Sequence, residues 1–251
     1  MFIASRTTGN RLLLGAALLI ASTAVTAQVN CCLQPNNTII GNVNADVTAA
    51  NCSCTIARTA NVNGNIDQTG DGALVVRGIV NGGVSESGAG NLTIDRGIVG
   101  GDCVEADAGS LAVRPGSFIN GALFETGGGN VTVTVGADGP AKGDIDEAGP
   151  GAVIVNVLGG AYEGNVVEAD GGFVDVSVAA GSAFKGGIAE SADGAVGAVV
   201  EGIFEGNIEE RGPGDLATEG AGWFKGNSEH ELPGTCSNTI KRFEGAACNP
   251  L

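Results

Sequence analysis

The chain has 251 residues and contains 44 Gly but only 8 Phe, 1 Tyr and 1 Trp, which excludes a globular core built on large side chains. A hydrophobic fraction of 43% is nevertheless too high for a disordered, solvated chain. The formal net charge of −16 argues against nucleic acid or an anionic membrane as partner, because phosphate binding needs a cationic surface.

Residues 1–27 have the pattern of a secretory signal peptide. Arg6 and Arg11 precede an apolar run over 12–20, and small residues lead to Ala27, after which we expect cleavage. The apolar run is too short to span about 30 Å of hydrocarbon. We therefore expect a protein that is secreted or held at the cell surface or in the periplasm, with no transmembrane segment in the mature chain.

Export would place the cysteines in an oxidising compartment. They gather at the two ends of the mature chain, so we predict disulfides within each end group and leave the three pairings of the first group open. Neighbouring cysteines lack the C-x₂-C spacing of a tetrahedral metal site, which is the less favoured alternative. Cys103 is left over as a spare thiol. The predicted disulfide cysteines are Cys31, Cys32, Cys52, Cys54, Cys236 and Cys248.

A repeat of about twenty residues organises the chain between these cysteine groups. Each repeat is marked by a glycine with an apolar residue two positions before it and another two positions after it. A second stretch of alternating apolar residues, such as Val153 and Val155, lies between successive markers. The ten markers are Gly41, Gly64, Gly82, Gly101, Gly121, Gly143, Gly164, Gly186, Gly206 and Gly226.

Such a period, with β-branched alternation and Gly, Asp and Asn between the extended stretches, predicts an all-β solenoid of stacked coils. The pattern resembles a secreted parallel β-helix, single-stranded, of about ten coils. The usual hand of parallel crossovers favours right-handed coiling. We expect an N-terminal cap over 28–38, the β-helix over 39–230 and a C-terminal cap over 231–251, with disulfides stapling both caps.

A glutamate recurs four residues after each of seven successive marker glycines, and these glutamates form one acidic stripe. Seven unpaired carboxylates inside a core would be prohibitively costly, so we expect a corner of the coil to turn them away from the interior. There they would lie in solvent, bind backbone amides or acquire raised pKa values, or hold Ca²⁺ between coils as the only cofactor. The stripe and candidate metal ligands are Glu86, Glu105, Glu125, Glu147, Glu168, Glu190 and Glu210.

A second set of charges lies in the N-terminal half. Four arginines recur at intervals close to the repeat length, and guanidinium groups grip carboxylates in a bidentate manner. They are candidates for binding an anionic sugar or surface polymer, or for pairing with acidic residues such as Asp95. This set consists of Arg58, Arg77, Arg96 and Arg114.

Many secreted parallel β-helices resemble polysaccharide lyases and hydrolases, which is the enzyme alternative. The nearly uniform repeats leave little sequence for a walled cleft, and no acid–base constellation can be assembled, so we predict no catalytic residues and no enzyme. The favoured interpretation is a secreted or cell-surface structural or interaction protein, an adhesin-like or matrix rod. Its expected partners are other surface or matrix components or further copies of itself.

Overall fold

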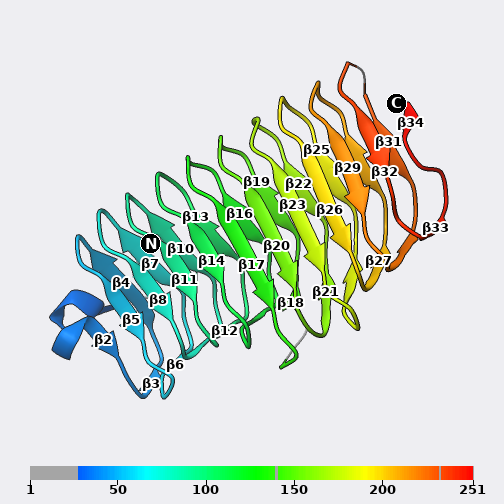
Figure 1. Ribbon diagram of the computed structural model, residues 1–251. Helices are drawn as coiled ribbons and strands as arrows, with labels where there is room; N and C mark the ends of the chain where they lie inside the picture. Colours follow the sequence, from blue (N-terminus) through cyan, green and yellow to red (C-terminus); the bar gives the residue numbers. More distant parts are fainter. Residues whose placement is uncertain (1–27, 139–140, 232, 251) are drawn as a thin grey trace, which may run out of the picture.

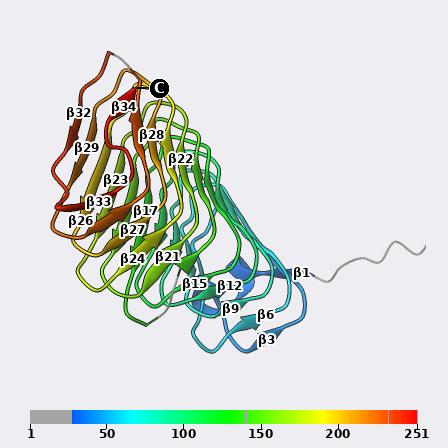
Figure 2. The ribbon, with the colours of Figure 1, turned by 90° about the vertical axis from the view of Figure 1, so that its right-hand side faces the viewer.

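The computed structural model describes residues 28–138, 141–231 and 233–250, so the predicted signal peptide lies outside the described residues. The described chain winds into a stack of coils that forms an elongated rod, with the first described residues (blue) at one end of the stack and the last (red) at the other (Figure 1). All strand pairs are parallel, and each coil contributes one strand to each of three faces (Figure 2). The predicted parallel β-solenoid is confirmed.

Two faces run the whole length of the rod. Sheet A has twelve strands, and sheet B has eleven. The strands of sheet A are β1 (Gln28–Asn30), β4 (Asp46–Ala50), β7 (Ile66–Thr69), β10 (Val84–Ser87), β13 (Cys103–Glu105), β16 (Leu123–Glu125), β19 (Ile145–Glu147), β22 (Val166–Glu168), β25 (Ile188–Glu190), β28 (Ile208–Glu210), β31 (Ser228–His230) and β34 (Asn249–Pro250). Those of sheet B are β2 (Thr38–Ile39), β5 (Cys54–Ile56), β8 (Leu74–Val76), β11 (Leu92–Ile94), β14 (Leu111–Val113), β17 (Val131–Val135), β20 (Val153–Val157), β23 (Val174–Val178), β26 (Val196–Val200), β29 (Leu216–Glu219) and β32 (Cys236–Asn238).

The third face is divided into two smaller sheets. Sheet C covers the N-terminal half with five strands, and sheet D covers the C-terminal half with six. The strands of sheet C are β3 (Asn42–Val43), β6 (Asn61–Val62), β9 (Ile79–Val80), β12 (Ile98–Val99) and β15 (Phe118–Ile119). Those of sheet D are β18 (Ala141–Lys142), β21 (Ala161–Glu163), β24 (Ala183–Lys185), β27 (Ile203–Glu205), β30 (Trp223–Lys225) and β33 (Arg242–Glu244).

The interior consists of aliphatic columns that run along the rod. Side chains alternate between the two faces of a strand, so the apolar residues two before and two after each marker glycine point inward together. Ile145, Val166, Ile188 and Ile208 are all buried, as the repeat predicts. Cys103 fills the same column, where burial raises the pKa of its thiol to about 12 and makes it a small hydrophobe.

A stack of aromatic rings fills the interior beneath sheet D. Tyr162, Phe184, Phe204 and Phe224 stack with centroids 4.8–5.0 Å apart, close to the strand spacing. Phe243 extends the stack at 4.7 Å. The Tyr162 hydroxyl donates to the Gly143 carbonyl oxygen at 2.7 Å, which satisfies the one polar atom of the stack. The four rings that precede Phe243 are buried, as expected of apolar residues that stand two positions before a marker glycine.

The C-terminal segment differs from the prediction. We expected residues 231–251 to leave the repeat as a cap, but β32, β33 and β34 pair in parallel with β29, β30 and β31 and add an eleventh coil. The physical reason is that Phe243 lies two positions before Gly245, so this segment repeats the marker pattern and buries its ring on Phe224.

The disulfides lie near the two ends of the rod, as predicted. Cys31 bonds Cys54, and Cys32 bonds Cys52, which fixes two short 3₁₀ helices, η1 (Cys31–Leu33) and η2 (Pro35–Asn37), over the first coil. At the other end Cys236 bonds Cys248. The sequence left the first pairing open because any two of the four cysteines could meet.

Candidate functional site

The glutamate column, as we call the seven residues of the acidic stripe, lies inside the rod. Each of the seven side chains has 0% of its surface exposed. The corner expected before these residues is absent, because the strands of sheet A continue through them, as β13 does from Cys103 to Glu105. The expectation that the column faces away from the interior is therefore wrong, and the alternation of the strand decides the orientation.

Backbone amides compensate the buried carboxylates. The turn after each strand aims N–H groups back at the Oε1 atom, as when Gly127 and Gly129 donate to Glu125 at 2.9 and 3.2 Å. Every glutamate of the column except Glu86 accepts at least one such bond. A carboxylate that accepts backbone N–H bonds gains charge-assisted stabilisation, which offsets part of the cost of burial.

A glycine four residues after each glutamate makes this turn. These residues form the glycine column: Gly90, Gly109, Gly129, Gly151, Gly172, Gly194 and Gly214. A Cβ on Gly129 would overlap the Gly109 carbonyl oxygen, and the same contact recurs from coil to coil along the column. Only glycine lets successive turns stack this closely while presenting their amides to the carboxylates.

The second oxygen of each glutamate faces the next glutamate. The strand register places Glu105 opposite Glu125, and Glu125 opposite Glu147. Among the described residues, the Oε2 atoms from Glu105 to Glu190 meet no N–H or O–H donor. Two ionised carboxylates side by side in the interior repel strongly, whereas a protonated carboxyl donates a hydrogen bond to its ionised neighbour. The column therefore holds protons that solvated glutamates would release.

This environment raises the pKa values of glutamates in the column. Burial is the main cause that raises the pKa of Glu147 to about 9, of Glu105 to about 8 and of Glu190 to about 7, and neighbouring glutamates raise each further. Burial also raises the pKa of Glu86 and of Glu210. The second of the outcomes expected from the sequence, amide binding with raised pKa values, is the one that the structure shows.

Neutral or basic residues end the column. Gln68 precedes it at the same register, and its Nε2 donates to the carbonyl oxygens of Thr69 and Gly70 at 3.2 and 3.3 Å. His230 follows Glu210 at the other end, again in register. The amide of Gln68 and the imidazole of His230 thus occupy the two positions at which a further glutamate would extend the row of carboxyl groups that repel one another when ionised.

The predicted metal site has a different setting from the one expected. The candidate ligands are buried, and six of the seven carboxylates already accept backbone hydrogen bonds. Within residues 28–138, 141–231 and 233–250, no group of three or more His, Cys, Asp or Glu side chains is arranged to hold a metal ion. Calcium binding by the glutamate column stays an untested hypothesis from the sequence.

The four arginines lie together on the surface beyond the ends of the sheet B strands, and we call them the arginine corner. The register of β8, β11 and β14 sets Asp95 between Arg77 and Arg114, and the Nε of Arg77 donates to the Asp95 carboxylate at 2.9 Å. This bond lowers the pKa of Asp95. Arg58 and Arg96 lie one position further along the chain, so the set is two short rows rather than the single row that the spacing suggested.

A third arrangement of charge escaped the sequence analysis. The residue before each marker glycine of sheet D alternates in sign and points outward, and strand pairing sets each one beside the next. Lys142 pairs with Glu163 at 2.8 Å, and Lys225 pairs with Glu205 at 2.8 Å. The alternating row consists of Lys142, Glu163, Lys185, Glu205, Lys225 and Glu244. The signal was present in the sequence as a sign change at every marker from Gly143 onward.

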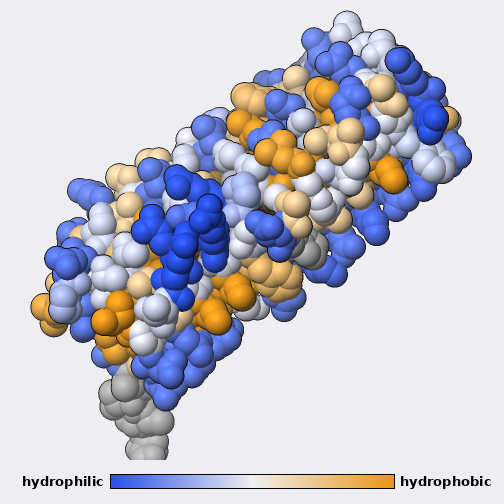
Figure 3. All heavy atoms as spheres, turned by 60° about the horizontal axis from the view of Figure 1, so that its bottom comes forward, coloured by the Kyte–Doolittle hydropathy of each residue, from blue (hydrophilic) through white to orange (hydrophobic). Residues whose placement is uncertain are grey.

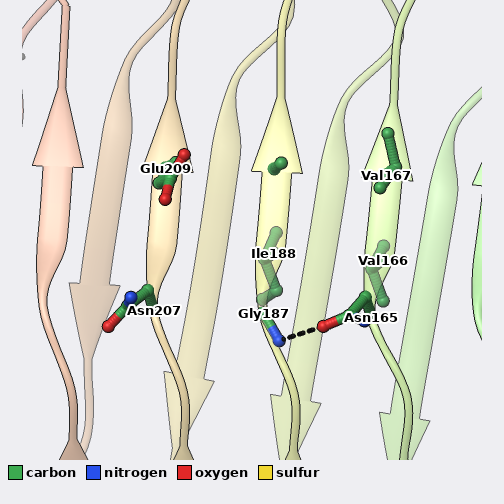
Figure 4. A pocket seen from close by; sticks show the side chains of 8 residues that line it. Asn165, Val166, Val167, Gly187, Ile188, Asn207 and Glu209 are labelled. Carbon is green, nitrogen blue, oxygen red and sulfur yellow. Dashed lines mark hydrogen bonds between the residues drawn. The ribbon is translucent and has the colours of Figure 1, made fainter.

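Surface hollows on the rod are shallow spaces between coils. Figure 4 shows one on sheet A, where the side chains of Val167 and Glu209 project outward and only the small Ala189 stands between them. Asn165 accepts a hydrogen bond from the Gly187 amide at 2.9 Å beneath it. The only acidic side chain lining this hollow, Glu209, already forms an ion pair with Arg211. No pair of carboxyl groups lines the hollow.

No protein-family model, curated protein or solved structure matches the chain. Among the described residues, no helix has the length and apolar character needed to cross a membrane. Disulfides near both ends fit an oxidising, extracellular environment.

Proposed function

We propose that this protein is an exported structural or interaction rod, of the adhesin-like or matrix kind. The observation that supports the proposal most directly is the uniformity of the coils. From β2 onward no two successive strands are separated by more than five residues, such as 126–130 between β16 and β17. A fold with such short connections offers an extended surface rather than a walled cleft.

The ends of the rod support the same role. Solenoid ends present unpaired strand edges that stick to other chains unless they are covered. Here two disulfides fasten the first turns over the N-terminal coil, and a third closes the last coil. These staples favour a rod of defined length, about 53 Å for the eleven steps of the twelve-stranded sheet.

The arginine corner is the surface that we propose for contact with acidic partners. It gathers four arginines, three of them (Arg77, Arg96 and Arg114) around the Asp95 carboxylate, on a chain whose net charge is −16. A hollow between coils, lined by Thr55, Arg58, Arg77 and Asp95, lies at this corner. Bidentate contacts from such a cluster suit the carboxylates of an acidic polysaccharide better than a neutral glycan.

The test has two parts. Negative-stain microscopy of the oxidised chain lacking residues 1–27 should show rods of the expected length, and a globular particle would contradict the structural role. Binding to immobilised polygalacturonate should fall with salt and should be lost in Arg77→Glu with Arg114→Glu, while Arg211→Glu, on another face, should bind as wild type does. Release of unsaturated or reducing sugars from polygalacturonate would instead favour the enzyme alternative.

A further inference from the structure

The outward face of sheet D carries two rows of side chains along the rod. One is the alternating row of lysines and glutamates. The other, two residues earlier on the strands from β21 to β30, runs through Ala161, Ala183, Ile203 and Trp223, and Arg242 follows it on β33. Figure 3 shows the molecule with the side along the bottom of Figure 1 turned forward, and apolar and charged groups lie next to one another along it. Ile203 is 37% exposed, although it lies in the middle of the face.

Each row is complementary to the same row of a second copy that runs in the opposite direction along the rod. In this arrangement a twofold axis relates the second rod to the first. The axis runs parallel to the strands, midway between β24 and β27, and the two sheet D faces lie against each other. Strand β24 then faces β27, β21 faces β30 and β18 faces β33. Lys185 meets Glu205 of the second copy, and the two outer pairs are likewise of opposite sign: Glu163 with Lys225, and Lys142 with Glu244.

The apolar row is complementary in size under the same operation. The small Ala161 faces the large Trp223 of the second copy, and Ala183 faces Ile203. Trp223 is half-buried, and the Lys225 ammonium lies 4.0 Å from its ring centroid. Large side chains opposite small ones let two sheet faces approach closely, so that both the charged and the apolar rows come into contact.

Other ways of laying two such faces together are unfavourable. Moving the axis by half a coil onto β24 sets Lys185 against Lys185 and Glu163 against Glu205, so that like charges meet throughout. A parallel pair of rods would lay the charged row of each copy on the apolar row of the other, which strips water from charges without giving them partners. Of these arrangements, the antiparallel register sets opposite charges together over all six strands of sheet D and pairs large with small apolar side chains over the four strands from β21 to β30.

We propose that sheet D is the interface of an antiparallel homodimer of this protein. The inference deepens the proposed structural role by naming a second copy as one partner, and it rests on that role only in requiring an intact rod. The face is about 24 Å long, five steps between six strands at the usual spacing, so we expect an interface at the small end of specific interfaces, with an affinity in the micromolar range.

The experiment uses the oxidised chain lacking residues 1–27 in sedimentation velocity, over protein concentrations from about 1 to about 200 µM, the range suited to a small interface. Wild type should pass from monomer to dimer, with weaker association in high salt because the pairs are exposed to screening. The emission of the single tryptophan, Trp223, should shift to shorter wavelength over the same concentrations as its ring loses water.

Two single charge reversals provide the decisive comparison. Lys185→Glu and Glu205→Lys each turn two symmetry-related contacts repulsive, so each variant alone should dimerise at least about a hundredfold more weakly. An equimolar mixture of the two variants has opposite charges at all six positions of the row and should dimerise again. Arg211→Glu, the same kind of charge reversal near sheet A, should leave dimerisation unchanged.

Circular dichroism and melting of each variant establish that the rod is intact, because exposed pairs contribute little to folding. Folded single variants that dimerise like wild type, or a mixture that stays monomeric, would overturn the proposed interface. A wild type that is monomeric throughout would also overturn it, while rods in the microscope and binding to acidic polysaccharide would leave the structural role standing.

Discussion

Nε2 of His230 lies 3.2 Å from Oε2 of Glu210, with both side chains buried at the end of the glutamate column. The imidazole also lies 3.1 Å from the Gly214 carbonyl oxygen. Glu210 therefore has a neighbouring group that can offer it a proton or a positive charge. The Oε2 atoms of the glutamates further into the column face only neighbouring carboxyl groups, so proton uptake by the column must be linked to folding.

Stability should fall as the pH rises from about 5 to 9. The pKa values of Glu190, Glu105 and Glu147 are raised to about 7, 8 and 9 from an ordinary value of 4.5. Between these limits the folded chain binds more protons than the unfolded chain, so the stabilisation is complete below pH 4.5 and is lost through pH 7–9. Urea denaturation at constant ionic strength should show a loss of at least about 1.4 kcal/mol, the equivalent of one pKa unit. A free energy of unfolding that is constant or rises over this range would contradict the shared-proton account.

Glu147→Gln should stabilise the protein at pH 9 by about 1 kcal/mol and should have little effect at pH 5. The amide keeps the shape of the protonated carboxyl and can donate to the neighbouring carboxylates, and Gln68 shows that the column accepts glutamine. Glu219→Gln, on the exposed outer side of sheet B, is the matched control and should shift stability equally little at both pH values. Destabilisation of Glu147→Gln at pH 9 would mean that the ionised form is the one that the fold requires.

The orientation of the glutamates shows where reasoning from the sequence alone stops. Parity along the strand places Glu125 on the same side as Leu123, and the structure keeps that parity. The cost of burying a charge suggested the opposite orientation, because the sequence does not reveal that the turn after Glu125 supplies the amides of Gly127 and Gly129. The aliphatic columns and the disulfides at the ends could be predicted, since period and redox chemistry suffice for them.

The eleventh coil and the alternating row were not predicted from the sequence, and the reason is a different one. Phe243 and Gly245 repeat the marker pattern, but Pro233 and the nearby cysteines suggested a cap. Lys142 and Glu163 stand one residue before their markers, and they form an ion pair only because strand pairing places their charged groups 2.8 Å apart. Both signals were in the sequence, and both needed the register of neighbouring coils to become visible.

Gly129→Ala should destabilise the protein by at least about 2 kcal/mol, because the added Cβ would overlap the Gly109 carbonyl oxygen and displace an amide from Glu125. Gly128→Ala is a control one residue away, since a Cβ there has no atom within 4 Å. Thermal melts of both variants at pH 5 and 9 measure the difference. Equal melting temperatures would show that the turn relaxes without loss and that the glycine column is not required.

Millimolar calcium should raise the melting temperature no more than sodium at matched ionic strength. A ligand that binds only the folded state stabilises it by RT ln(1 + [L]/Kd), so a cation held by the glutamate column would reveal itself in this measurement. We expect no such gain, because the carboxylates of Glu125, Glu147 and Glu168 each place one oxygen on a backbone amide and the other beside a neighbouring glutamate. Calcium would have to displace the shared protons from a column without exposed surface.

The triple variant Glu125→Gln, Glu147→Gln and Glu168→Gln distinguishes the two accounts. If calcium stabilises wild type and the triple variant loses that gain, the glutamate column is a cation site and its protons are released on binding. If protons alone occupy it, the triple variant should be insensitive to calcium, like wild type, and its stability should depend less on pH between 5 and 9. Measuring both proteins at pH 9, where the column is most ionised, gives calcium its best opportunity to bind and makes a negative result decisive.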